Sequence, residues 1–172
     1  MKKLVFILTT IAILGVMQTS KAQKAQNIVD IAVSVDDFST LVAALKAADL
    51  VGALQGDGPF TVFAPVNSGF AKIDKATLNA LLEPANKEKL SAILTYHVVA
   101  GKLAASDVAA ALKGGNGKAE LTTLQGGKLT AVSKNGGIYL KHANGNYTKI
   151  AKTDVMASNG VIHIIEDVVM PK

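Results

Sequence analysis

The sequence contains no cysteine, no tryptophan and no arginine. Without cysteine, the chain forms no disulfide and offers no thiolate ligand to a metal. Its basic side chains are all lysines and are scattered along the chain, whereas nucleic-acid readers rely on clustered charge and on the forked guanidinium of arginine. The formal net charge of +5 falls to +2 for residues 23–172, because three lysines lie before them. The composition therefore argues against a nucleic-acid partner.

Aromatic residues are also scarce, at 5% of the chain, although hydrophobic residues make up 49%. Alanine, valine, leucine and isoleucine must therefore build the core, and packing must supply the stability that disulfides give many exported proteins. About 150 residues are enough for one domain with a sizeable core.

The first residues have the layout of a signal peptide. Lys2 and Lys3 precede an apolar run from Leu4 to Met17, and small residues follow at Ser20 and Ala22. A membrane anchor is the alternative, but a span needs about 20 apolar residues. We expect residues 1–22 to be cleaved near Ala22 and residues 23–172 to form a single domain. That domain would be secreted, periplasmic or at the cell surface, with no stable membrane insertion after cleavage.

The N-terminal part of residues 23–172 has the sequence pattern of several helices and one strand. Asn27 and Asp37 are suitable N-caps, and the helix that starts at Asp37 is expected to run to about Leu54. A short strand, Phe60–Ala64, ends at a proline, after which Asn67 is expected to cap a helical turn. Further helices are expected from Asp74, ended by Pro84, from Asn86, closed by Gly101, and over Ser106–Leu112.

The back of the chain changes to strand periodicity. Strands are expected over Glu120–Leu124, Lys128–Lys134, Gly137–His142, Tyr147–Thr153 and Val161–Ile165. The first four are separated by Gly126-Gly127, Asn135-Gly136 and Asn144-Gly145, and Asn-Gly supplies the positive φ angles of tight hairpin turns. This spacing predicts an antiparallel meander and, with the helices, one α+β domain.

Catalytic and metal-binding patterns are weak. His97, His142 and His163 lack the ligand spacing of a metal motif, although they could converge in space. Ser68 lies at a strand-to-helix turn, but its neighbours do not form the G-x-S-x-G of hydrolases. The glycine-rich segment 113–119 does not match a phosphate-binding loop. We expect no enzyme activity, no cofactor and no metal.

Three segments stand out instead: TVFAPVNSGF at 61–70, LTYHVVAGKL at 94–103 and NGVIHIIEDVVMP at 159–171. In this order and at this spacing they resemble the two boxes and the central Tyr-His motif of the fasciclin (FAS1) domain family. The resemblance extends from about Asn27 to Pro171, nearly the whole of the expected domain. One departure is Gly69, where the family usually has a small residue, most often alanine. A glycine there weakens a helical turn by up to about 1 kcal/mol.

The resemblance implies an α+β fold in which two β-sheets form a wedge or sandwich with helices packed along one side. It also implies an exported, non-enzymatic interaction or adhesion module, similar to small single-domain bacterial members. The partner would be a surface protein, a matrix component or a polysaccharide, and the module is expected to be a monomer. A carrier of a small lipophilic ligand, held in a cleft lined by aliphatic side chains, is the alternative.

Tyr96 and His97 are the binding residues that the resemblance implies, because the Tyr-His region has been tied to integrin binding in animal members. A structural role is the alternative. His97 falls on one helical face with Leu90, Ile93 and Leu94, which suits a buried, hydrogen-bonded histidine. Tyr96 lies off that face and can direct its hydroxyl elsewhere. His163 alternates with apolar residues along a strand and is expected in the core.

Overall fold

The structure, a computed structural model, describes residues 25–171, so the expected signal peptide lies outside the described residues. The helices are α1 (Ile28–Ser34), α2 (Ser39–Ala47), α3 (Val51–Gln55), α4 (Asn67–Phe70), α5 (Lys75–Leu82), α6 (Lys87–Tyr96) and α7 (Ala105–Gly114), with 3-10 turns at Asp36–Phe38 and Pro84–Asn86. The strands are β1 (Phe60–Pro65), β2 (Val98–Ala100), β3 (Lys118–Thr122), β4 (Lys128–Lys134), β5 (Gly137–Lys141), β6 (Tyr147–Ala157) and β7 (Gly160–Ile165). Within this described range, no helix has the length and apolarity needed to cross a membrane.

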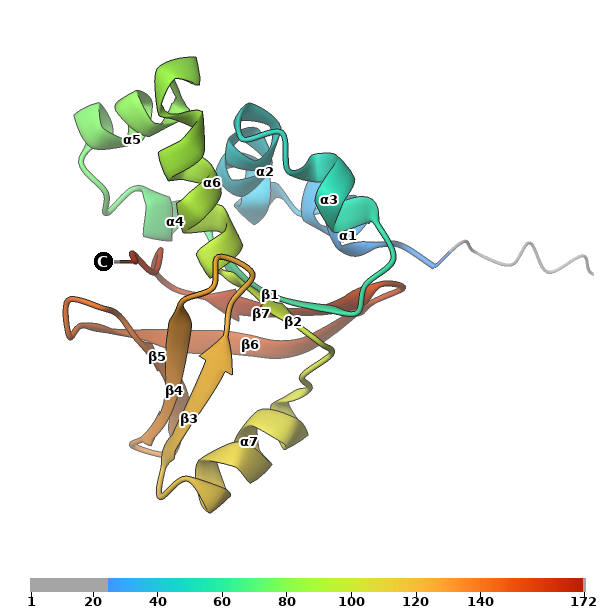
Figure 1. The fold of residues 1–172 in the computed structure, drawn as a ribbon, viewed down its shortest axis with the longest axis vertical. Coiled ribbons are helices and arrows are strands. Elements are labelled where there is room, and N and C mark those ends of the chain that lie inside the picture. The colour runs from blue at the N-terminus through green and yellow to red at the C-terminus, as the bar shows by residue number, and fades with distance from the viewer. Residues whose placement is uncertain (1–24, 172) are drawn as a thin grey trace, which may run out of the picture.

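The seven strands form one sheet in the order β2-β1-β7-β6-β5-β4-β3. Strands β1 and β7 pair in parallel, and the other neighbours are antiparallel. Irregular pairing divides β6 between a half that contacts β7 and a half that contacts β5. A bridge between Val99 and Thr123 brings the two ends of the sheet together, so the sheet almost closes. Helices α1 to α6 gather on one side and α7 lies on the other (Figure 1). The α+β class that the sequence predicts is confirmed.

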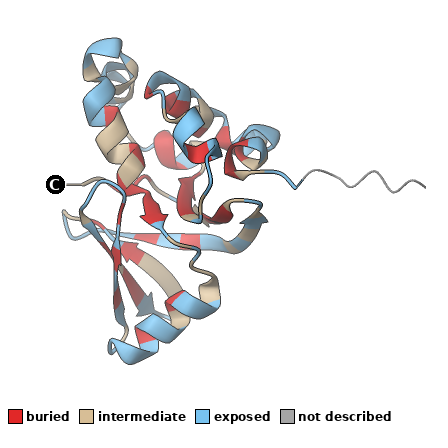
Figure 2. Ribbon diagram, turned by 45° about the vertical axis from the view of Figure 1, so that its right-hand side comes forward, coloured by how far each residue is buried: buried red, intermediate tan, exposed pale blue. Residues whose placement is uncertain are grey.

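The core has two parts, one on each side of the central strands. Because successive side chains of a strand point to opposite faces, Val62 packs under the helices while Phe63 packs toward β4 and α7. Ile162 and Ile165 of β7 divide in the same way. Figure 2 shows buried residues along these strands and exposed ones on the outer faces of the helices. A strand buried on both faces explains why β1 and β7 are almost wholly apolar.

The helix expected from Asp37 to Leu54 is wrong in two respects. Asp37 lies in a 3-10 turn and does not cap α2. The helix also breaks at Asp49, which has a left-handed φ of 58°. The N–H of Leu50 donates to the Leu45 carbonyl at 3.0 Å, and the N–H of Asp49 donates to the Lys46 carbonyl at 3.1 Å. These two bonds form a Schellman motif, which usually has glycine or asparagine at the left-handed position.

The meander predicted from the Asn-Gly turns is confirmed. Gly136 and Gly145 have positive φ angles of 75° and 91°, as tight turns require. Strand β6 continues to Ala157, past the predicted end at Thr153. Asp154 adopts a φ of 60° within a stretch of shifted register, so the strand bulges there and then resumes its pairing with β7.

Candidate functional site

Asn67 holds the start of α2, although the sequence suggested that it caps its own helical turn. Its Oδ1 accepts the N–H of Thr40 at 3.0 Å, and its Nδ2 donates to the Asp36 carbonyl and to Ser39 Oγ, both at 2.9 Å. The N-cap residue of α4 is Val66, and no side-chain bond caps that helix. Asn67 therefore replaces the missing cap of a helix that lies 27 residues earlier in the chain.

Gly69 allows the C-terminal segment to lie close to α4. A methyl group added at this position would lie 2.7 Å from the carbonyl oxygen of Glu166 and 3.0 Å from the Cα of Asp167. Such contacts are too short for a Cβ atom, so either backbone would have to shift. The absence of a side chain at Gly69 therefore serves close packing between two segments that are distant in sequence.

His97 lies inside the fold, between α6 and the C-terminal segment. Its side chain is 3% exposed. The N–H of Val169 donates to Nε2 at 2.9 Å, so Nε2 carries the lone pair, and Nδ1 donates its proton to the Ile93 carbonyl at 2.8 Å. Burial lowers the pKa of His97 to about 4, although the bond to Ile93 opposes this shift. His97 is thus a neutral histidine that joins α6 to the end of the domain.

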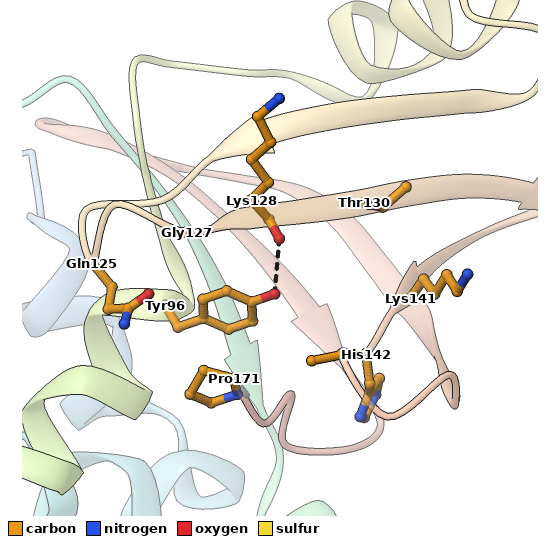
Figure 3. Close-up of a pocket in the computed structure, with 9 residues that line it drawn as sticks. Tyr96, Gln125, Gly127, Lys128, Thr130, Lys141, His142 and Pro171 are labelled. Atoms are coloured by element: carbon orange, nitrogen blue, oxygen red, sulfur yellow. Dashed lines mark hydrogen bonds between the residues drawn. The ribbon is translucent and has the colours of Figure 1, made fainter.

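Tyr96 points to the opposite side of α6 and packs in the second part of the core. Its hydroxyl donates to the Lys128 carbonyl at 2.9 Å, and burial raises the pKa of the phenol. Only 5% of Tyr96 is exposed, but the ring borders an open pocket (Figure 3). Of the two residues expected to bind a partner, Tyr96 therefore reaches a pocket that His97 does not line.

The pocket beside Tyr96 has a volume of about 440 Å³. It lies where the end of α6, the β3–β4 turn, the end of β5 and the C-terminal segment meet (Figure 3). Its lining residues are Tyr96, Gln125, Gly127, Lys128, Thr130, Lys141, His142, Ala143 and Pro171. The lining includes two lysines and no carboxylate, but Lys128 turns its carbonyl toward Tyr96 and its ammonium away from it (Figure 3).

The two lysines of the pocket differ in how far their charges are already neutralised. Lys128 Nζ lies 2.6 Å from Glu120 Oε2, and this hydrogen-bonded ion pair raises the pKa of Lys128. Among residues 25–171, Lys141 has no ion-pair partner. Lys141 is therefore the lysine of this pocket whose charge is unpaired, although its exposed side chain extends away from Tyr96 (Figure 3) and must turn to meet a ligand.

His142 supplies the unusual polar group of the pocket. It is 8% exposed, and its buried Nε2 has no hydrogen-bond partner among the described residues. Burial lowers the pKa of His142, and the nearby carboxylate of Asp167 opposes that shift. From the sequence, His142 is only a possible metal ligand, and Lys141 and Gln125 do not stand out. A Lys-His pair before an Asn-Gly turn is too weak a pattern to indicate a binding pocket.

The remaining candidate groups have structural roles. His163 Nε2 donates to the Leu103 carbonyl at 2.8 Å, and its Nδ1 accepts the N–H of Asp154 at 3.3 Å. It is 1% exposed, in the core as expected. Ser68 is exposed, and no hydrogen bond joins it to a histidine in the described chain. Within residues 25–171, no three His, Asp or Glu side chains lie close enough together to hold a metal ion.

Comparison with known proteins shows which family and which proteins this chain is similar to. The fasciclin domain model matches residues 36–171. The chain is 45% identical to protein sll1483 of Synechocystis sp. over 157 residues, which cover 91% of this chain and 80% of that protein. It is 32% identical to the immunogenic protein MPB70 of Mycobacterium bovis, with 78% and 64% covered. It is 35% identical to the transforming growth factor-beta-induced protein ig-h3 of Sus scrofa, but the match spans only 19% of that protein.

A solved structure shares the fold. It is a FAS1 domain pair from the insect cell adhesion molecule Fasciclin I, with a TM-score of 0.73 over 83% of this chain and 50% of that chain. The sequence identity is 17%, so this likeness concerns the fold alone. The α+β wedge fold that the sequence resemblance implies is therefore confirmed, with the difference that α7 lies on the opposite side from α1 to α6.

Proposed function

The chain belongs to the fasciclin domain family, and from that premise we propose that it is an exported, non-catalytic interaction or adhesion module. It binds a surface protein, a matrix component or a polysaccharide without covalent chemistry. After removal of residues 1–22 it acts as a single monomeric domain that is secreted, periplasmic or held at the cell surface. The fasciclin fold occurs in a cell adhesion molecule, which supports this class of function.

The observation that carries the proposal is how the motif residues are used. Asn67, His97 and His163 all form hydrogen bonds between segments that are distant in sequence. Their polar atoms are engaged in holding the fold, so they are poor candidates for a nucleophile or a general base. Tyr96, by contrast, borders a pocket that opens to solvent. This arrangement suits recognition by a stable surface better than it suits a reaction.

The carrier of a lipophilic ligand remains the second candidate, and the structure limits where it could hold its ligand. The apolar cavity inside the core has a volume of about 20 Å³, whereas ligand pockets usually measure about 300–1,000 Å³. A groove of about 480 Å³ between α1, α2 and α3 is larger and is lined mainly by aliphatic side chains, including Val29, Val33 and Val42. A second open pocket, of about 350 Å³ and lined in part by Leu112 and Ile138, is the other place where a lipophilic ligand could lie.

The test separates the two functions by what the protein captures. The purified protein serves as bait for the proteins and polysaccharides of its own host's envelope fraction, and an organic extract of the same preparation is examined for small molecules. Capture by the folded bait, but not by a heat-unfolded bait, supports the interaction module. A lipophilic molecule present at about one per protein, without capture of an envelope component, would favour the carrier.

A further inference from the structure

We propose that the pocket beside Tyr96 binds a uronate, a sugar ring that carries a carboxylate, within an acidic polysaccharide. The inference rests on the proposed interaction function and names the chemistry of the partner. The site is formed by Tyr96, Lys141 and His142 together with the polar side chains of Gln125 and Thr130 (Figure 3).

The size and openness of the pocket suit one or two units of a polymer. Its volume of about 440 Å³ falls in the range of ordinary ligand sites, about 300–1,000 Å³. It is formed by turns and strand ends and opens to the solvent, so a bound sugar unit can remain part of a longer chain. A deep closed cavity would admit only a free small molecule.

The charge of the lining selects for an acid. Lys141 has no ion-pair partner within residues 25–171, whereas Lys128 is paired with Glu120. The lining itself contains no carboxylate. The exposed side chain of Lys141 can turn toward a carboxylate in the pocket, and the nearby carboxylate of Asp167 is already paired with Lys72. Charge-assisted hydrogen bonds are stronger than neutral ones.

His142 contributes a ring nitrogen that has no hydrogen-bond partner among the described residues. Its Nε2 is buried without a partner, which costs free energy in the unliganded protein. The residue lines the pocket, and because the terminal torsion of histidine is broad, rotation of the ring can turn the buried Nε2 toward a ligand. A hydroxyl or carboxylate oxygen in the pocket can then supply the partner that the protein does not.

The remaining lining distinguishes a sugar from a simple anion or a lipid. The Tyr96 ring and Pro171 offer apolar surface, and Gln125 and Thr130 offer an amide and a hydroxyl. A sugar ring has apolar C–H faces and several hydroxyls, so it matches both kinds of surface. A wholly apolar ligand would remove water from Lys141 and Gln125 without replacing their hydrogen bonds. An inorganic anion would make no use of Tyr96 and Pro171.

The direct test is calorimetric titration of the purified protein, expressed from the full chain, with digalacturonate. Digalactose serves as the neutral probe, since it has a CH₂OH group where digalacturonate has a carboxylate. We expect digalacturonate to bind at least ten-fold more tightly than digalactose. Galacturonate and polygalacturonate then distinguish a free sugar acid from a polymer, and the polymer is expected to bind more tightly. Tighter binding of the monosaccharide than of the polymer would contradict the polysaccharide assignment.

Variants place the binding in this pocket. Lys141→Met removes the charge and is expected to weaken digalacturonate binding about ten-fold, whereas Lys89→Met, on the exposed surface of α6, should leave it unchanged. His142→Leu should also weaken binding but should not lower the melting temperature, because it removes an unpartnered nitrogen. A structural role for His142 would instead lower the melting temperature.

Three results would overturn the inference: equal affinity for the acidic and neutral disaccharides, equal effects of the Lys141 and Lys89 variants, or equal binding of a short peptide's C-terminal carboxylate. If digalacturonate fails to bind while the folded bait still captures an envelope component, the pocket assignment is wrong and the interaction module stands. If neither binds, both proposals are wrong.

Discussion

The N–H of Val169 donates to Nε2 of His97 at 2.9 Å, so a backbone group near the end of the domain is satisfied by a side chain at the end of α6. The bond requires a neutral imidazole, because a protonated Nε2 cannot accept a hydrogen bond. Proton binding by one histidine is therefore coupled to the docking of the C-terminal segment.

We expect the protein to lose stability in mild acid. An unfolded histidine binds its proton near pH 6.5, whereas burial lowers the pKa of folded His97 to about 4. Between these values the unfolded chain binds more protons, so the free energy of unfolding falls as the pH falls. The full effect is about 3 kcal/mol, present above pH 6.5 and lost by pH 4. Burial of His142 acts in the same direction.

Urea unfolding at several pH values from 7 to 4 measures this loss. The control is His97→Gln, which keeps a donor and an acceptor but does not titrate. It should be less stable at pH 7 and should show a flatter pH dependence. Parallel curves for the two proteins would mean that His97 is not the group responsible.

Asn67→Ala is expected to lower the free energy of unfolding by about 2 kcal/mol. The change removes the hydrogen bond that Asn67 accepts from Thr40 and the two that its amide donates to Asp36 and Ser39. Each is worth about 1 kcal/mol, and hydrogen bonds to water compensate for part of that free energy. Asn67→Asp keeps the acceptor for Thr40, so its free energy of unfolding should lie between those of the unchanged protein and of Asn67→Ala. Chemical denaturation ranks the three proteins. An alanine variant with unchanged stability but no partner binding would instead assign Asn67 to recognition.

Gly69→Ala is expected to destabilise the fold by about 1–3 kcal/mol, because the new methyl group meets the backbone at Glu166 and Asp167. Gly52→Ala is the matched control: Gly52 lies in α3 with no atom within 4 Å of an added Cβ. That change should raise stability by up to about 1 kcal/mol. Thermal unfolding of both variants is the measurement, and shifts of the same sign would contradict the close approach at Gly69.

Tyr96→Phe separates the structural and binding roles of the Tyr-His motif. The change removes the hydrogen bond to the Lys128 carbonyl but keeps the ring, so the free energy of unfolding should fall by only about 1 kcal/mol. The variant should remain folded and retain most of its affinity for digalacturonate. His97→Ala, by contrast, should abolish binding only where it also unfolds the protein, as circular dichroism at each temperature will show.

Local signals in the sequence predict much of this fold. The dipeptides Asn135-Gly136 and Asn144-Gly145 are enough to predict the two turns, because their glycines adopt the positive φ angles that tight turns need. Strands joined by such turns form an antiparallel meander. Asp74 caps α5 by accepting the N–H of Thr77, as its position before that helix indicates. Such features need no knowledge of the rest of the chain.

The sequence does not predict the contacts that a side chain makes with distant segments of the chain. Asn67 looks like a local cap, but its partners lie about 30 residues earlier. The pocket combines Tyr96, Gln125, Lys141 and Pro171 from four separate segments, and no spacing in the sequence connects them. The break at Asp49 is missed for another reason: its Schellman bonds tolerate an aspartate where glycine or asparagine is usual.

Strand β7 is the last strand of the chain, yet it lies between β1 and β6 near the middle of the sheet. Its partner β1 precedes it by about 100 residues, so the parallel pair forms only when nearly the whole chain is available. Because synthesis proceeds from the N-terminus, β1 is made about 100 residues before the strand that pairs with it in parallel. Loss of the final dozen residues would remove the middle of the molecule and not an edge.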